Sequence, residues 1–134
     1  MNIQKVLQKH KEIVFTLLFG SFARNSSNVL SDVDIAIFTD RTLDILEFGM
    51  LVSDLEQECQ RKVDLVILND LYKTDARLAF NIINAHQIIF CNDKDAYIDF
   101  KSDTMQYYFD IEPMYEMFDK QLLKRLDNGT YGEV

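Results

Sequence analysis

The sequence predicts an α/β domain in which helices pack on a small mixed β-sheet. Four apolar runs have the length and composition of strands, and helical repeats of apolar residues lie between or around them. The first two runs are joined by a polar stretch without a helical repeat, so we expect mixed rather than all-parallel strand pairing. The 134 residues match one domain, with a core over about residues 1–92 and a C-terminal helical tail over about 93–127.

Each expected element rests on its own residue pattern. The strands are short runs of aliphatic and aromatic residues, and the helices repeat apolar residues every three to four positions. In chain order we expect a helix over residues 2–12, strands over 15–21 and 33–38, a helix from about 42 to 60, a strand over 62–68, a helix over 75–85, a strand over 87–91 and a helical tail from 93. Residues 23–31 are rich in Asn and Ser and predict a loop.

Three of these elements carry a further signal. Thr42 or Asp44 is a suitable N-cap for the helix that follows it. The run over 62–68 is almost continuously apolar, so we expect a strand in the centre of the sheet. Pro113 interrupts the helical tail, because Pro disfavours helix at the residue before it, and we expect a kink or a new helix start there.

Charge and composition exclude several classes of function. Fourteen Lys and Arg residues stand against 22 Asp and Glu residues, which gives a net charge of −8 and a pI near 4.6. Clustered Lys and Arg hold DNA, RNA and anionic membranes, so this balance opposes non-specific binding to any of them. We therefore expect no DNA and no membrane among the partners, and the acidic surface favours a basic partner.

The cysteines and the apolar runs bear on the compartment. Cys59 and Cys91 are the two cysteines of the chain and show no C-x-x-C spacing. A disulfide between them is one interpretation, and two reduced thiols are the favoured one. No apolar run is long enough to span a membrane, and the first residues lack the apolar stretch of a signal peptide. We expect a soluble, cytoplasmic protein.

The strongest chemical signal lies in residues 20–38, GSFARNSSNVLSDVDIAIF. Asp32 and Asp34 stand two apart at the start of an expected strand, so their side chains should point to one face. Two neighbouring carboxylates repel each other unless a divalent cation joins them, and oxygen ligands suit Mg²⁺ or Mn²⁺. Upstream, Gly20 and Ser21 end a strand without a bulky side chain, which lets backbone N–H groups approach a phosphate closely.

Each part of this pattern alone is weak evidence for a function, because most D-x-D pairs are solvated and a single G-S pair is common. Their combination at this spacing is far more specific. The segment resembles the nucleotidyltransferase superfamily typified by DNA polymerase β, and more narrowly the minimal nucleotidyltransferases, whose fingerprint is G-S-x-A-R-G-x5-S-D-x-D. The matching residues are Gly20, Ser21, Ala23, Arg24, Ser31, Asp32 and Asp34. Asn25 replaces the usual Gly, and Asn tolerates the left-handed backbone of such a turn.

This resemblance implies a fold, a reaction and roles for named residues. The fold would be the polymerase β palm-like nucleotidyltransferase fold, and the reaction would use ATP as substrate and Mg²⁺ or Mn²⁺ as cofactor. Asp32 and Asp34 would be catalytic residues that hold the metal on the triphosphate. The nucleotide-binding residues would be Gly20, Ser21, Arg24 and Ser31. For Arg24, a salt bridge or a solvated loop position is an equally good explanation.

The family also has a third carboxylate on a later strand, and Asp64 is the natural candidate. A charged residue inside an apolar strand is costly unless it is paired or bound to metal. In the two-metal mechanism that the resemblance implies, Asp64 would bind the second metal ion and help to deprotonate the incoming hydroxyl. The alternative is an ion pair of Asp64 with Lys62 or Arg61.

The helical tail bears on the acceptor of the nucleotide. Between residues 99 and 119 it has six acids against one Lys, interleaved with aromatic residues. Part of the aromatic set should pack on the sheet, and the remainder forms an acidic and aromatic surface suited to a basic protein. The resemblance implies an antitoxin that forms a hetero-oligomer with a helical HEPN-type RNase toxin and adenylylates a tyrosine hydroxyl of that toxin.

Three alternatives stay open on the sequence alone. The chain could modify a small molecule, as aminoglycoside nucleotidyltransferases do, although those enzymes carry a sizeable extra domain. It could act on nucleic acid, which the lack of a basic patch opposes. It could also be a non-catalytic antitoxin that acts by binding alone. Nothing in the sequence selects adenine over guanine, and ATP enters through the resemblance.

Overall fold

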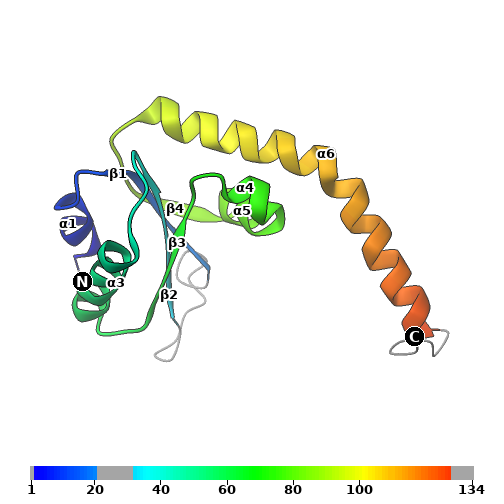
Figure 1. Ribbon diagram of the computed structural model, residues 1–134, viewed down its shortest axis with the longest axis horizontal. Coiled ribbons are helices and arrows are strands. Elements are labelled where there is room, and N and C mark those ends of the chain that lie inside the picture. Colours follow the sequence, from blue (N-terminus) through cyan, green and yellow to red (C-terminus); the bar gives the residue numbers. More distant parts are fainter. Residues whose placement is uncertain (1, 21–31, 128–134) are drawn as a thin grey trace.

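The structure, a computed structural model, describes residues 2–20 and 32–127. The elements, labelled as in Figure 1, are α1 (Ile3–Gln8), β1 (Ile13–Phe19), β2 (Val33–Thr39), α3 (Ile45–Cys59), β3 (Val63–Ile67), α4 (Leu71–Thr74), α5 (Ala76–Asn84), β4 (His86–Cys91) and α6 (Lys94–Asp127). The predicted α/β class is confirmed. α1 is shorter than expected, because Ile13 belongs to β1 and the chain has to turn before it. The short α4 was not predicted.

In the part of the chain that the structure describes, four strands form one mixed sheet in the order β3-β2-β1-β4. β1 is antiparallel to β2 and β4, and β2 is parallel to β3, so the predicted mixed pairing is confirmed. The prediction of a central strand over 62–68 is wrong, because β3 lies at an edge of the sheet. Its apolar character has another cause. Val63 and Leu65 are buried in a cluster on one face of the sheet and Leu68 in a cluster on the other, so both sides of this segment are covered.

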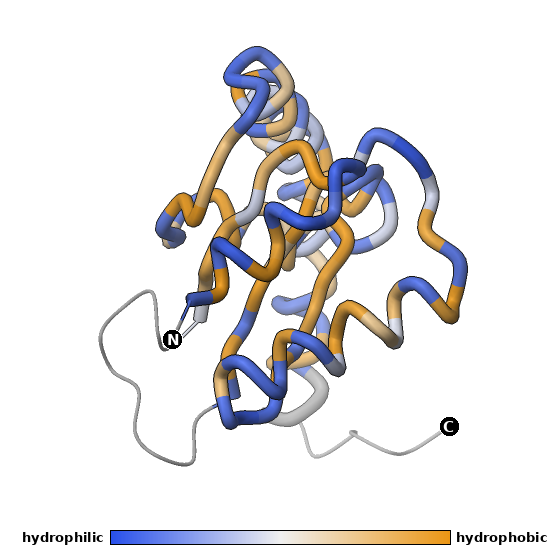
Figure 2. Tube along the Cα trace, turned by 90° about the vertical axis from the view of Figure 1, so that its left-hand side faces the viewer, coloured by the Kyte–Doolittle hydropathy of each residue, from blue (hydrophilic) through white to orange (hydrophobic). Residues whose placement is uncertain are grey.

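Helices cover both faces of the sheet (Figure 1). α1 and α3 pack on one face, where Leu7 and Leu55 are fully buried. α5 and the first part of α6 pack on the other face, around Phe15, Ile82 and Phe100. Figure 2 shows hydrophobic segments running through the sheet, with hydrophilic segments frequent in the surrounding loops. The core is therefore split into two clusters by the sheet, and the second cluster ends beside the candidate site.

α6 is one helix of 34 residues that continues through Pro113. Figure 1 shows that it changes direction near its middle, where a Pro removes one helical hydrogen bond, so the structure has a kink rather than a new helix start. Its first part is anchored by Phe100, whose ring packs on Phe15, Phe38 and Tyr72. Its last part projects away from the sheet and exposes the apolar residues Met114, Met117, Phe118, Leu122 and Leu123. We call residues 112–123 the outer segment of α6.

Two expectations from the sequence concern the cysteines and membrane-spanning helices. Cys59 and Cys91 are both free thiols, which confirms the favoured interpretation. Burial raises the pKa of the Cys59 thiol, so the neutral form is favoured at this position. Within the part of the chain that the structure describes, no helix combines the length and the apolar composition that crossing a membrane requires.

Candidate active site

Gly20 follows β1 directly and lies against the carboxylate of Asp34 on β2. Phe19 and Asp34 are neighbours in the β1–β2 register, which brings the next residue of the chain to the Asp34 side chain. The backbone φ of Gly20 is +74°, a left-handed conformation that Gly adopts without steric cost. A Cβ at this position would overlap Oδ2 of Asp34 and stand 3.0 Å from its Cγ. Two separate constraints, backbone conformation and contact with the carboxylate, thus require Gly at this position.

Four residues form a row across the end of the sheet. His86 pairs in register with Phe19, Phe19 with Asp34, and Asp34 with Asp64. Register partners on neighbouring strands point their side chains to the same face of a sheet. Phe19 packs with the cluster under α5 and α6, which identifies that face. The row therefore brings the carboxylates of Asp34 and Asp64 next to each other, on the side of the sheet where Gly20 adjoins Asp34.

The three predicted carboxylates differ in exposure. Asp32 precedes β2 and is exposed, Asp34 is half-buried within β2, and Asp64 is exposed on β3. Asp64 is therefore not the buried charge that we expected, because its edge strand leaves this carboxylate in water. Asp64 forms no ion pair with Lys62 in residues 2–20 and 32–127. In the same ranges no group of three or more His, Cys, Asp and Glu side chains converges closely enough to hold a metal ion.

Three predicted nucleotide-binding residues, Ser21, Arg24 and Ser31, lie outside the described residues. Their roles stay predictions that rest on the sequence motif. Gly20, Asp32, Asp34 and Asp64 are all described, and three of them are brought together: Gly20 and Asp34 by contact, Asp34 and Asp64 by register. Asp32 stands two residues before Asp34, at the entry to the same strand.

Sequence reasoning missed His86, the fourth residue of the row. Its Nδ1 lies 2.9 Å from the carbonyl oxygen of Ile82, and its Nε2 lies 2.7 Å from Oη of Tyr97. A carbonyl can only accept, so Nδ1 donates to it, and in the neutral ring the Tyr97 hydroxyl then donates to Nε2. A lone His at the start of a strand belongs to no motif, and only the β1–β4 register brings it to this end of the sheet.

A pocket of about 470 Å³ opens beside Gly20. Its lining comes from the end of β1 and from the last turns of α5, and includes Phe19, Gly20, Leu78, Asn81 and Asn84. Because Gly20 also contacts Asp34, the pocket adjoins the predicted catalytic carboxylates. We call it the α5 pocket. Pockets of about 300–1,000 Å³ are usual for small ligands, and this volume falls within that range.

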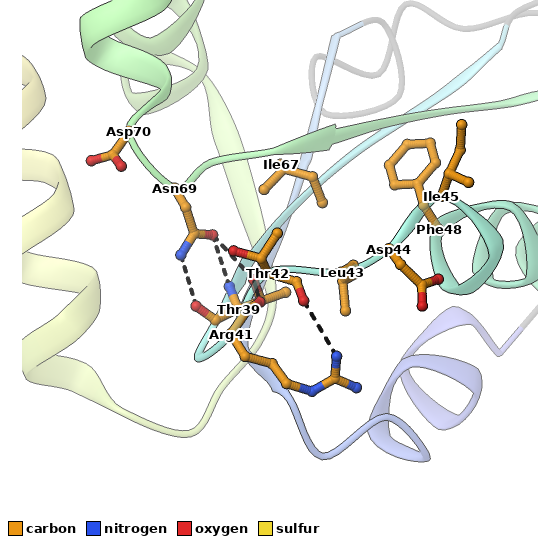
Figure 3. A pocket seen from close by; sticks show the side chains of 10 residues that line it. All are labelled: Thr39, Arg41, Thr42, Leu43, Asp44, Ile45, Phe48, Ile67, Asn69 and Asp70. Atoms are coloured by element: carbon orange, nitrogen blue, oxygen red, sulfur yellow. Dashed lines mark hydrogen bonds between the residues drawn. The ribbon is translucent and has the colours of Figure 1, made fainter.

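A second pocket, of about 450 Å³, lies where β2 and β3 end (Figure 3). The amide of Asn69 closes it on one side, since it accepts from the Thr39 N–H at 3.0 Å and donates to the Thr39 carbonyl at 2.7 Å. On another side the guanidinium of Arg41 donates two hydrogen bonds to Glu47 and holds the pKa of that carboxyl at about 2. These polar groups satisfy one another, and none of the predicted site residues lines this pocket.

Comparison with known proteins identifies the class to which this fold and site belong. Residues 1–95 match the family model of the polymerase beta nucleotidyltransferase domain. This match includes the motif, the four described strands and the helices α1, α3, α4 and α5. The chain therefore belongs to the polymerase beta nucleotidyltransferase family, and the resemblance drawn from residues 20–34 is confirmed.

Individual proteins of similar sequence show which members of the family this chain resembles. The chain is similar to two candidate protein adenylyltransferases of Methanocaldococcus jannaschii. MJ1215 is 34% identical over 77 residues, which are 52% of this chain and 90% of that protein. MJ0128 is 39% identical over 73 residues, which are 49% of this chain and 74% of that protein. A third candidate protein adenylyltransferase of the same organism, MJ0126, is 31% identical over 78 residues.

Solved structures confirm the predicted nucleotidyltransferase fold. A chain of a toxin–antitoxin crystal structure with AMP-PNP has a TM-score of 0.77 at 20% identity, covering 92% of this chain and 99% of that one. A chain of the tri-AMPylated Shewanella oneidensis HEPN toxin in complex with MNT antitoxin has a TM-score of 0.70 at 20% identity, with coverages of 91% and 96%. Spectinomycin adenyltransferase AAD(9) from Enterococcus faecialis has a TM-score of 0.55 at 13% identity, with coverages of 69% and 55%.

Proposed function

We propose that this protein is an antitoxin that transfers AMP from ATP to a tyrosine hydroxyl of a cytoplasmic HEPN-type RNase toxin. The observation that carries the proposal is the placement of Gly20 against Asp34, with Asp64 in the next register position. In the reaction, the hydroxyl oxygen attacks the α-phosphorus of ATP. The bond from that phosphorus to the oxygen bridging to the β-phosphate breaks, pyrophosphate leaves, and the hydroxyl proton passes to a base at the site.

Mg²⁺ or Mn²⁺ is part of this proposal, and the donor set at the site suits such an ion. Asp34 and Asp64 are like charges in adjacent register positions, an arrangement that weakens a sheet unless a cation offsets it. Carboxylate oxygens are the ligands that these hard cations prefer. Asp32, Asp34 and Asp64 would hold the metal after their side chains turn toward it, because the three carboxylates do not converge in the structure. A bound divalent cation offsets the charge that develops on the phosphates as pyrophosphate leaves.

The remaining residues of the motif would bind and orient the nucleotide. Gly20 lacks the Cβ that would keep a phosphate at a distance, and its backbone adopts a left-handed conformation. Ser21 would donate to the β and γ phosphates together with backbone N–H groups, and Arg24 and Ser31 would complete the phosphate contacts. Asp64 would in addition take the proton of the acceptor hydroxyl.

A HEPN-type toxin as acceptor is supported by three observations. The relatives from Methanocaldococcus jannaschii are candidate protein adenylyltransferases, so a protein acceptor is favoured over a small one. Similar folds occur in toxin–antitoxin complexes, one of which holds an AMPylated HEPN toxin. The outer segment of α6 exposes large apolar side chains beside acids, and monomeric proteins rarely expose such clusters without a partner.

The reaction itself is the first prediction. Incubation of this protein with Mg²⁺, ATP and its HEPN-type toxin should add at least one AMP unit to a toxin tyrosine, detected as a mass increase on the tyrosine-containing peptide. The RNase activity of the toxin should fall in parallel. Transfer to an aminocyclitol such as spectinomycin, with none to protein, would instead support the small-molecule function. Full neutralisation without any mass increase would support a non-catalytic antitoxin.

The partner surface gives the second prediction. Asp110→Lys with Glu116→Lys, both exposed on α6, should slow association with the toxin about tenfold at low salt, because charge complementarity acts mainly on the rate of encounter. The matched control is Asp40→Lys with Asp54→Lys, which makes the same charge change at exposed positions elsewhere. Surface plasmon resonance at two salt concentrations measures the effect. Equal slowing by both pairs would show that net charge, and not α6, governs association.

A further inference from the structure

We infer that the α5 pocket receives the adenine base of the donor nucleotide, and that Asn81 and Asn84 recognise the edge of that base. The inference rests on the proposed function, which supplies the nucleotide, and it adds the residues that select its base. The pocket shares Gly20 with the predicted phosphate site, so a nucleotide whose phosphates lie at Gly20 can extend into it without leaving the protein surface.

The lining of the pocket suits a base and does not suit a phosphate. Phe19, Leu78 and Ile82 provide apolar surface, and the two Asn side chains provide amide groups. None of the described residues that line the pocket is a Lys or an Arg. Apolar surface beside a few placed polar groups is the usual environment of a flat heterocycle, whereas phosphates need cations or convergent N–H groups.

The polarity of α5 supports the same assignment. α5 ends at Asn84, so Asn81 and Asn84 belong to its last turns and Ala85 is its C-cap. The C-terminal end of a helix carries a partial negative charge from carbonyls without helical partners. This field opposes a phosphate in the pocket and favours a neutral group that donates hydrogen bonds. The exocyclic amino group of adenine is such a group.

Hydrogen bonds of His86 attach the lining of the pocket to the rest of the domain. Its Nδ1 donates to the carbonyl of Ile82, a residue that lines the pocket, and its Nε2 accepts from Tyr97 on α6. These bonds join the last turn of α5 to β4 and α6. The amide-bearing turn is thus fixed relative to Gly20 before a ligand arrives, which lowers the entropic cost of binding.

The two amides match the chemistry of adenine. Asn81 and Asn84 are exposed, lie three positions apart on α5, and form no hydrogen bond through their side chains within residues 2–20 and 32–127. Adenine presents its amino donor beside a ring-nitrogen acceptor, and one Asn amide satisfies both by accepting and donating. The corresponding edge of guanine presents O6 and N7, which are both acceptors. The oxygen of the Asn amide would find no donor there.

The test is a comparison of two nucleotides on two forms of the full chain. Isothermal titration with Mg²⁺ measures the binding of ATP and of purine riboside 5′-triphosphate, which lacks the amino group. The wild-type protein should bind ATP about tenfold tighter than the analogue. The variant Asn81→Ala with Asn84→Ala should lose this preference, binding ATP no more tightly than the wild type binds the analogue, while its affinity for inorganic tripolyphosphate stays unchanged. Ala raises helix propensity at both positions, so α5 should stay folded.

Asn92→Ala, at the opposite end of β4, is the matched control and should leave all three affinities unchanged. Two results would overturn the inference alone: wild-type ATP affinity in the double variant, or an equal loss of affinity for ATP and for the analogue. If the wild-type protein binds neither ATP nor tripolyphosphate, the proposed function fails, and this inference fails with it.

Discussion

Asp34→Asn should reduce AMP transfer by about a thousandfold, because the neutral amide cannot hold the divalent cation that offsets phosphate charge. The same change should leave the protein folded. It removes the repulsion between the carboxylates of Asp34 and Asp64, which are register partners, and it keeps the shape of the side chain. Mass spectrometry of the acceptor and thermal unfolding of the variant measure the two effects.

Asp40→Asn is the matched control for this variant. Asp40 follows β2 at the end opposite to Asp34 and is exposed, so its loss should change neither transfer nor stability. Asp64→Asn distinguishes the role of Asp64 from that of Asp34. This variant should abolish transfer, while ATP still binds through Gly20 and Asp34. Transfer at the wild-type rate by Asp34→Asn would remove this residue from the active site.

Gly20→Ala should lower AMP transfer about a hundredfold and destabilise the protein by about 1–2 kcal/mol. The stability loss follows from placing an L side chain at a φ of +74°. The activity loss follows from the Cβ, which would overlap the Asp34 carboxylate and displace it from its position beside Asp64. Denaturant unfolding gives the first quantity, and the initial rate of transfer gives the second.

Gly49→Ala is the control for this substitution, because Gly49 lies within α3 and a Cβ there would meet no atom within 4 Å. It should raise stability by about 0.5–1 kcal/mol through helix propensity and leave transfer unchanged. If Gly20→Ala kept full transfer, neither the backbone conformation nor the contact with Asp34 would matter for the reaction.

The order of elements could be predicted because local patterns determine them. Asp44 is an example: its side chain accepts from the Glu47 N–H at 2.7 Å, and the Glu47 carboxylate accepts from the Asp44 N–H at 3.2 Å. This capping box is visible in four consecutive residues. The position of β3 could not be predicted in the same way. An apolar strand reports that both of its faces are covered, and it does not report how many strands flank it.

In the candidate site, too, some residues could be predicted from local sequence patterns and others could not. Gly20, Asp32 and Asp34 belong to one short motif whose spacing is visible in the sequence, and the structure brings Gly20 and Asp34 into contact. Asp64 was identified through the resemblance, and it is not the buried charge that we expected. His86 and Asn81 have no local signal, because they reach the site through strand register and through the packing of α5 on the sheet. Such residues become visible only with tertiary structure.

The projection of α6 beyond the domain has a consequence for how a partner would be modified. Thirty-four helical residues extend over about 51 Å at about 1.5 Å per residue, so the outer segment lies well away from the root of the helix at β4. A partner bound along this arm stays tethered to the domain while its acceptor residue samples the active site. The effective concentration of that residue is then set by the geometry of the arm and not by the bulk concentration of the partner. Contacts at the active site itself can consequently be weak, and release after one transfer is not required before the next.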